Sequence, residues 1–204
     1  MQNLSTSALY QAQKEKCSAY WKQWGIDIPW DKLFIPPQSE GLITLGYEPR
    51  LFTEDQKIQK YKEHHGEDVV WCYYHTQNKT IEESIKRQGA RPIAGYLYWY
   101  EGNQEPDTKH LNKSYDMFSI EYDKTFAIPT EGITMADRYR LETGTMMDIV
   151  GLTRFDALDA DGNAMSMCRN GNGRFFMNGS TPGSRDEGFG PREIKFLYPS
   201  PFRR

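Results

Sequence analysis

The chain has 204 residues, of which 38% are hydrophobic and 26% charged, and its formal net charge is −3. This length is typical of one domain with its own core, and the slightly acidic balance gives no reason to expect nucleic acid as a partner. No run of about 18 apolar residues occurs, so the sequence encodes no membrane-spanning helix and we expect no membrane partner.

The cysteines and the N-terminal residues bear on the compartment. Cys17, Cys72 and Cys168 are odd in number and far apart, which argues against a disulfide framework. The first residues lack the basic and apolar regions of a secretory signal. We therefore expect a cytoplasmic protein by default, with no cofactor.

The N-terminal region predicts a helix followed by an extended segment. Residues 7–24 form an amphipathic pattern, with Ser7 as a candidate N-cap and Gly25 just past the end. Four prolines follow between residues 26 and 52. Because proline removes an amide donor, this stretch is predicted to be extended and looping.

Two capping boxes predict the next helices. The box at residues 53–56 opens a helix that should stop near Gly66, and the box at residues 80–83 opens one that should end at Gly89. Residues 68–75 and 93–100 are rich in aromatic and β-branched side chains and predict strands. Strand, helix and strand in this order suggest a parallel unit, although other pairings remain open.

The middle of the chain is less regular. Residues 102–114 predict a loop, and residues 113–128 are compatible with either a helix or a strand. Thr134 then resembles the cap of a helix that continues to Thr143, with Gly144 past its end.

The composition changes near residue 151, where arginine and glycine become frequent. Asn-Gly and Asp-Gly pairs between short runs predict a β-meander over residues 151–198. About fifty residues of hairpins need the preceding helices to complete a core. The prediction is one α+β domain over residues 1–204, with a mixed sheet and several short helices in the N-terminal two-thirds, and the meander packed on residues 1–150.

Two patterns suggest metal sites. Asp159, Asp161 and Asn163 match the first ligand positions of a calcium loop, but Ala164 stands where that loop needs glycine. A turn in which the aspartates accept from their own backbone explains the same residues. Cys72 and His75 resemble half a zinc site, but residues three apart on a strand point to opposite faces. We therefore predict no metal site.

The tyrosines at positions 96, 98 and 100 share one face of a predicted strand. Exposed, this row would stack on bases or sugars, whereas buried it belongs to the core. The acidic chain offers no partner for a phosphate backbone, which favours the core.

The arginine bias is the candidate binding feature. Arg154, Arg169, Arg174 and Arg192 lie on predicted neighbouring strands and can make the planar, bidentate contacts that lysine cannot. They can clamp an anionic small ligand or an acidic protein surface. The alternative is internal pairing with the acidic residues of the same region.

One resemblance concerns the C-terminal half. Short motifs of this half occur in the order Glu105-Pro106-Asp107, Gly132-Ile133-Thr134, Leu141-Glu142, Asp148-Ile149, Thr153, Asp161-Gly162 and Arg192-Glu193. In this order the half resembles a group of uncharacterised small bacterial proteins. That group has no established activity, so the resemblance implies a bacterial protein of unknown function and no catalytic residue. Residues 153–156 replace the Cys-Ser-Gly-Ser-Arg-like run of that group. Gly190-Pro191-Arg192 is also similar to the last strand of C-type-lectin-like modules.

Three functions follow as hypotheses. The first is a non-catalytic binding module that presents the loop between residues 170 and 191, and the absence of catalytic motifs favours it. The second is a hydrolase or transferase in which Asp107, Asp159 or Asp161 meets His110 beside the arginines. The third is a structural subunit of a phage or mobile element.

Overall fold

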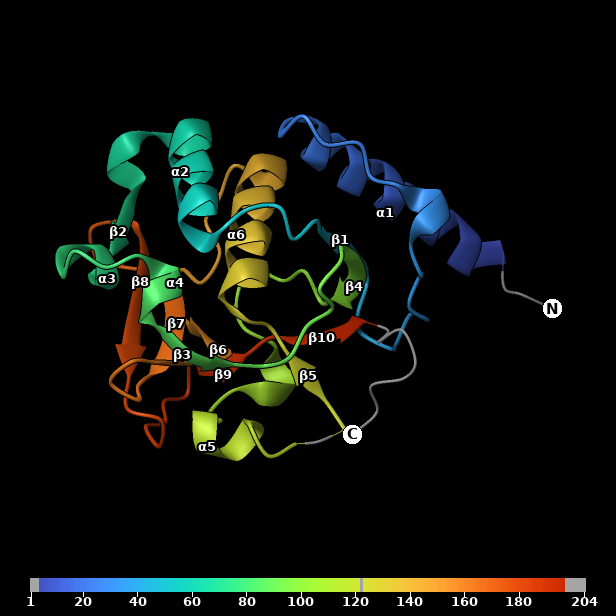
Figure 1. The fold of residues 1–204 in the computed structure, drawn as a ribbon. Helices are drawn as coiled ribbons and strands as arrows, with labels where there is room; N and C mark the ends of the chain where they lie inside the picture. Colours follow the sequence, from blue (N-terminus) through green and yellow to red (C-terminus); the bar gives the residue numbers. More distant parts are fainter. Residues whose placement is uncertain (1–3, 122, 197–204) are drawn as a thin grey trace. The chain divides into compact units, whose positions relative to one another are not determined.

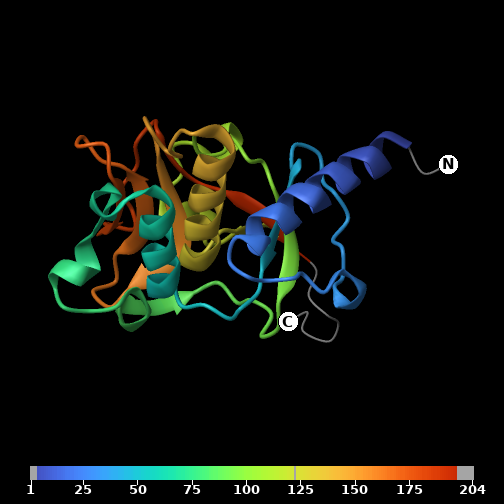
Figure 2. The same ribbon diagram turned by 90° about the horizontal axis from the view of Figure 1, so that it is seen from above.

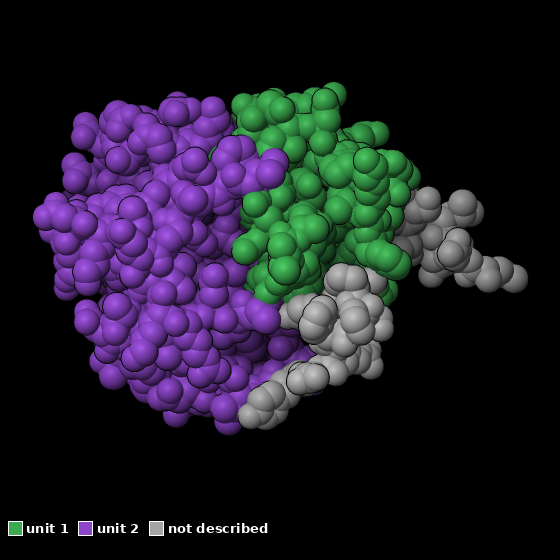
Figure 3. Space-filling model, in the orientation of Figure 1, with its two compact units in different colours: residues 1–50, 91–102, 194–204 green, residues 51–90, 103–193 purple. Residues whose placement is uncertain are grey.

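The computed structural model describes residues 4–121 and 123–196, which form an α+β fold with two β-sheets (Figure 1). Contacts group the chain into two compact units, each assembled from segments that are separate in the sequence (Figure 3). Unit 1 contains residues 1–50, 91–102 and 194–204, and unit 2 contains residues 51–90 and 103–193. That all 204 residues behave as one domain stays a prediction.

Unit 1 is built around an aromatic strand. Its elements are α1 (Leu4–Lys22), the 3₁₀ turn η1 (Trp30–Lys32), β1 (Thr44–Glu48), β4 (Tyr96–Tyr100) and residues 194–196 of β10 (Glu193–Phe196). Strand β4 lies between β1 and β10 and is antiparallel to both. Its three tyrosines are buried, which confirms that the row belongs to the core.

Unit 2 contains the larger sheet. Its helices and 3₁₀ turns are α2 (Glu54–His65), η2 (Glu67–Val69), α3 (Tyr73–Thr76), α4 (Ile81–Ser84), η3 (Thr108–His110), α5 (Tyr115–Phe118) and α6 (Pro129–Thr143). Its strands are β2 (Val70–Cys72), β3 (Ile85–Gln88), β5 (Thr125–Phe126), β6 (Leu152–Asp159), β7 (Ala164–Arg169), β8 (Phe175–Ser180) and β9 (Phe189–Pro191). The sheet order is β2-β8-β7-β6-β3, and β9 pairs in parallel with β6.

Helix α6 covers one face of this sheet. It packs on β6 and β7, and α2 lies beside it (Figures 1 and 2). Gly132 allows this close approach, because a Cβ at that position would collide with the ring of Phe155 on β6. The chain thus leaves out a side chain where helix and sheet come closest.

Local capping signals determine three helix ends. Thr53 and Gln56 form both bonds of a capping box at the start of α2, and Thr80 and Glu83 do the same for α4. Gly144 ends α6 with φ of 75°, a left-handed conformation that glycine adopts without a steric penalty. These predictions are confirmed.

Several predicted helix boundaries are wrong. Helix α1 already includes Leu4, so Ser7 is not its cap. Helix α4 ends at Ser84 instead of Gly89, because the next residues pair with β6 as β3. Helix α6 begins at Pro129, whose fixed φ suits a first helical turn, and Thr134 lies inside it.

The two aromatic segments do not form a parallel unit. Strand β2 covers only Val70–Cys72 and pairs in parallel with β8 of unit 2, while β4 belongs to unit 1. The residues after β2 turn into the short helix α3 instead of extending to His75. Residues 113–128 contain both a short helix, α5, and a short strand, β5.

The β-meander is confirmed for β6, β7 and β8, which pair antiparallel in chain order. The last predicted strand, β10, instead pairs with β4. Across the described residues, none of the helices combines the length and apolar character needed to cross a bilayer. The three cysteines are free.

Candidate functional site

A row of polar side chains crosses the sheet of unit 2. Arg154 on β6 lies opposite Ser166 on β7, and Ser166 lies opposite Asn178 on β8. Directly opposed residues of neighbouring strands share one face of a sheet. Ser166 Oγ donates a hydrogen bond of 2.9 Å to Asn178 Oδ1, which joins the members of the row on β7 and β8.

Arg154 is the charged member of this row and is completely buried. Its Nη1 donates to Ser180 Oγ at 3.1 Å and its Nη2 to Ser184 Oγ at 2.9 Å. The ring of Phe189 lies 5.5 Å from the guanidinium carbon. Serine hydroxyls and an aromatic face, instead of a carboxylate, therefore surround this cation.

The electrostatics of Arg154 are unusual for a buried arginine. Among the described residues it forms no ion pair, and its Nε has no hydrogen-bond partner. Burial lowers the pKa of the guanidinium, and the charge of Asp186 partly opposes this. A buried charge whose hydrogen-bond partners are all neutral costs free energy that a bound anion can recover.

Arg192 has a structural role. Its Nη2 donates to Asp148 Oδ1 at 2.6 Å, and its Nε donates to Thr153 Oγ1 at 2.8 Å. The remaining donors bind the carbonyl oxygens of Asn103 and Gln104, each at 2.9 Å. Burial raises the pKa of Asp148 and the arginine opposes this, so the pair balances its own charge inside unit 2.

Arg169 and Arg174 flank the turn between β7 and β8. The side chain of Asn170 closes this turn by accepting from the backbone N–H groups of Asn172 and Arg174. Arg169 lies three positions along β7 from Ser166, the neighbour of Arg154, which corresponds to about 10 Å. The four predicted arginines therefore do not form one site.

The hydrogen-bond partners of the His110 ring are Glu193 and Lys113, and none of the acids of the enzyme hypothesis is among them. That histidine is buried, and its Nε2 lies 2.9 Å from Glu193 Oε2 while Nδ1 lies 3.2 Å from Lys113 Nζ. Since the lysine is a donor, Nδ1 accepts and the proton sits on Nε2. Hydrogen bonding to His110 and the nearby Lys109 lower the pKa of Glu193 to about 2.

The aspartates serve local structure instead. Asp159 Oδ1 accepts from the backbone N–H groups of Asp161 and Asn163 at 3.0 and 2.8 Å, as predicted for a turn. Asp107 Oδ2 accepts from the backbone of Glu193 at 2.6 Å. Asp159 therefore closes its own turn, whereas Asp107 joins its segment to a residue 86 positions away in the sequence.

The structure brings together one cluster of potential metal ligands that no sequence pattern predicted. His64 and His65, in the last turn of α2, both reach Asp137 on α6. One ligand atom of each lies within 4.8 Å of the other two, the only such group among the described residues. The adjacent histidines lack the usual i, i+4 spacing, and Asp137 lies more than 70 positions away in the sequence, so no local signal joins them.

Cys72 and His75 do not share a ligand site. The ring of His75 pairs with Asp55, and burial raises the pKa of the Cys72 thiol. The contact between His75 and Asp55 and the burial of the thiol are both explained without a metal ion.

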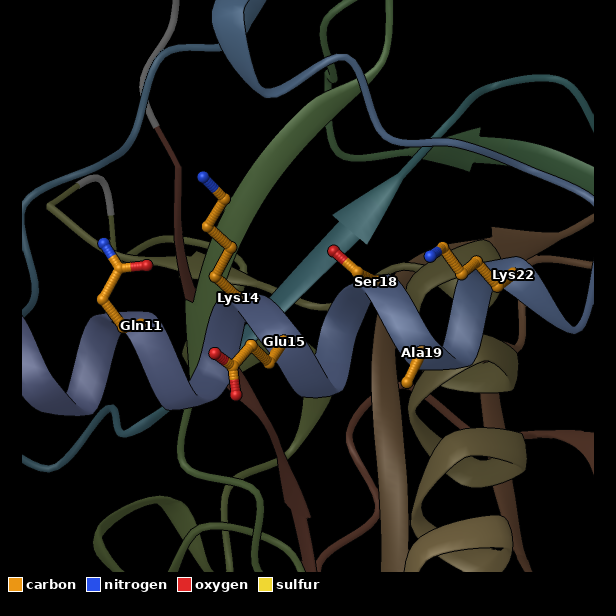
Figure 4. Close-up of a pocket in the computed structure, with 6 residues that line it drawn as sticks. All are labelled: Gln11, Lys14, Glu15, Ser18, Ala19 and Lys22. Atoms are coloured by element: carbon orange, nitrogen blue, oxygen red, sulfur yellow. The ribbon is translucent and has the colours of Figure 1, made fainter.

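The hollows along α1 do not have the form of a ligand-binding site. One of about 320 Å³ is lined by side chains of that helix alone (Figure 4). Figure 4 shows Lys14, Ser18 and Lys22 on one side of the helix and Glu15 and Ala19 on the other. Because a single helix surface supplies every group, they do not enclose a ligand.

No family model, no curated protein and no solved structure matches this chain.

Proposed function

We propose that this protein is a non-catalytic binding module that takes an anionic group at Arg154. The observation that carries the proposal is a completely buried arginine whose partners are two serine hydroxyls and an aromatic ring. Arginine presents five N–H donors in a planar fork that fits carboxylate and phosphate oxygens. Two of these donors are engaged by neutral acceptors that an anion can replace.

The loop over Arg154 provides the access. Residues 181–188 connect β8 to β9, and most of them are exposed. Ser184 Oγ donates to Thr181 O at 2.7 Å, and the backbone N–H of Gly188 donates to Asp186 Oδ1 at 3.0 Å. These bonds lie within the loop and would persist if it moved away from the arginine, whereas the bonds from Arg154 Nη2 to Ser184 Oγ and from Arg185 Nε to Asn112 O would break.

A bound anion would be the ion-pair partner that Arg154 lacks among the described residues. An anion at Arg154 would gain charge-assisted hydrogen bonds, which are about twice as strong as neutral ones. Ser180 would then be free to donate its hydroxyl proton to the same anion, while Ser184 keeps its hydrogen bond to Thr181 O. An acidic protein surface and an anionic small molecule share this chemistry, and both belong to the proposal.

A cytoplasmic location is part of the same proposal, and the free cysteines support it because a reducing compartment keeps thiols unpaired. The hydrolase hypothesis receives no comparable support, since both ring nitrogens of His110 are already engaged.

Backbone amide NMR shifts test the proposal during titration with inorganic phosphate or a glutamate-rich peptide at constant ionic strength. We expect saturable shifts centred on residues 181–188, and we expect Arg154→Met to abolish them. Arg185→Ala is the matched control, because Arg185 is exposed on the same loop and its Nε donates only to Asn112 O. If neither probe gives saturable shifts, or if Arg154→Met responds like the unchanged protein, the function is not anion binding at Arg154.

A further inference from the structure

The cluster of His64, His65 and Asp137 has the composition of a transition-metal site. His64 Nδ1 lies 2.9 Å from Asp137 Oδ2, and His65 Nε2 lies 2.9 Å from Asp137 Oδ1. Two imidazole nitrogens and one carboxylate oxygen are a common ligand set for zinc when a water occupies the fourth position. Calcium and magnesium prefer oxygen ligands alone.

The spacing of the three residues suits an ion after a small expansion. Zinc bonds of about 2.0–2.2 Å in a tetrahedral arrangement separate ligand atoms by about 3.3 Å. The nitrogen–oxygen distances here are 2.9 and 3.0 Å. Each nitrogen–oxygen pair therefore needs to open by a few tenths of an ångström to hold an ion, and the two ring nitrogens lie within 4.8 Å of each other.

Different ring atoms explain how two adjacent residues converge. Successive helical residues point about 100° apart, since a turn contains 3.6 residues. His64 uses its near nitrogen, Nδ1, whereas His65 uses its far nitrogen, Nε2. The two rings thus reach the same carboxylate from different directions, as metal ligands must.

The surrounding structure holds the ligands in place. The Tyr61 ring lies 4.5 Å from that of His65 and 5.0 Å from that of Phe175 on β8. Two turns before His64, Lys57 Nζ donates to Thr130 O, Thr130 Oγ1 and Thr134 Oγ1 at 2.7–3.0 Å. These bonds join α2 to α6, so both ligand-bearing helices are fixed before an ion arrives.

The site is also reachable from solvent. Asp137 is 1% exposed, while the side chains of His64 and His65 are 12% and 7% exposed. The carboxylate is therefore the most buried of the three ligands, and solvent reaches the cluster through the partly exposed imidazoles.

We propose that His64, His65 and Asp137 form a binding site for one divalent transition-metal ion, with zinc as the ion that best fits the ligand set. Three protein ligands leave a coordination position for water or for an anionic ligand atom. The site is independent of Arg154 and goes beyond the proposed anion binding. Without an ion, the two imidazoles donate N–H groups to Asp137, so zinc takes over lone pairs after these protons move or leave.

Two measurements on the full chain without an affinity tag test the proposal: the metal content of the protein as purified, and metal binding after chelator treatment. We expect one zinc ion per chain by elemental analysis and calorimetry, no comparable binding of magnesium or calcium, and a visible spectrum of four-coordinate cobalt. Asp137→Asn and His65→Gln should each weaken zinc binding by at least about 100-fold, because loss of an outer partner alone costs about 10–100-fold.

Two controls separate ligand loss from misfolding. His75→Gln removes a histidine that pairs with Asp55 outside the cluster, so it should bind zinc like the unchanged chain. Circular dichroism confirms that each variant is folded. The proposal is overturned if folded Asp137→Asn binds zinc as tightly as the unchanged chain, or if His75→Gln loses as much affinity as His65→Gln.

Discussion

Glu54 offers the sharpest link between structure and stability. It lies in the first turn of α2, where α2 meets the start of α4, and it is buried beside Glu82. Burial, together with a hydrogen bond to Glu82, raises the pKa of Glu54 from its ordinary 4.5 to about 7. Burial also raises the pKa of Glu82, but hydrogen bonds from Asp55 and Glu54 outweigh it and lower that pKa to about 2. Glu54 therefore keeps a proton that Glu82 accepts.

The free energy at stake follows from the pKa of Glu54. A rise from 4.5 to about 7 corresponds to about 3 kcal/mol, since each pKa unit is worth about 1.4 kcal/mol. The folded state binds this proton more tightly than the unfolded chain does. The associated stability is therefore complete below about pH 4.5 and is lost as the pH rises through about 7.

The perturbation is Glu54→Gln, which keeps a donor toward Glu82 and removes the titration. At pH 8 we expect the variant to be more stable than the unchanged chain by about 2–3 kcal/mol, and at pH 5 by less than about 1 kcal/mol. Urea unfolding followed by circular dichroism at several pH values measures this difference. Groups that titrate in both proteins cancel from the comparison.

Glu67→Gln is the control, because the side chain of Glu67 is 71% exposed and its replacement should change neither curve. A difference between Glu54→Gln and the unchanged chain that is the same at pH 5 and pH 8 would refute the argument, since Glu54 would then ionise as it does in the unfolded chain.

Two further predictions concern packing and charge in unit 2. Gly132→Ala should lower the free energy of unfolding by about 1–3 kcal/mol in urea melts, because the new Cβ collides with Phe155. The Cβ of the control Gly171→Ala meets nothing within 4 Å, so that variant should be nearly neutral. Equal effects of the two substitutions on the free energy of unfolding would contradict this prediction. Arg192→Ala should cost about 3–5 kcal/mol, because it leaves Asp148 buried without its partner, and a thermal melt no different from that of the unchanged chain would show that the pair contributes nothing.

The sequence allowed the locally determined features to be predicted. The capping boxes at Thr53 and Thr80, the left-handed Gly144 and the turn at Asp159 each satisfy their hydrogen bonds within a few residues. Such features depend on side chains that compete for nearby backbone groups, so composition and order are sufficient. The hairpins of β6, β7 and β8 belong to the same class.

Predictions failed where distant segments compete with local preference. The residues after Ser84 could continue a helix, but pairing with β6 makes them a strand. The two aromatic strands could pair with each other, but β2 joins β8 and β4 joins β1 and β10. Which strands pair depends on how the whole chain buries its apolar side chains, and a short stretch of sequence does not contain this information.

The candidate sites divide in the same way. Composition alone identified the arginine-bearing C-terminal region, and it predicted an α+β chain with buried tyrosines. Only the tertiary structure separated Arg192, paired with Asp148, from Arg154, which faces two serines. It also joined His64 and His65 to Asp137 across two helices. The physical reason is that charge pairing and ligand geometry depend on distances of about 3 Å between side chains, and folding sets these distances between residues that are far apart in the sequence.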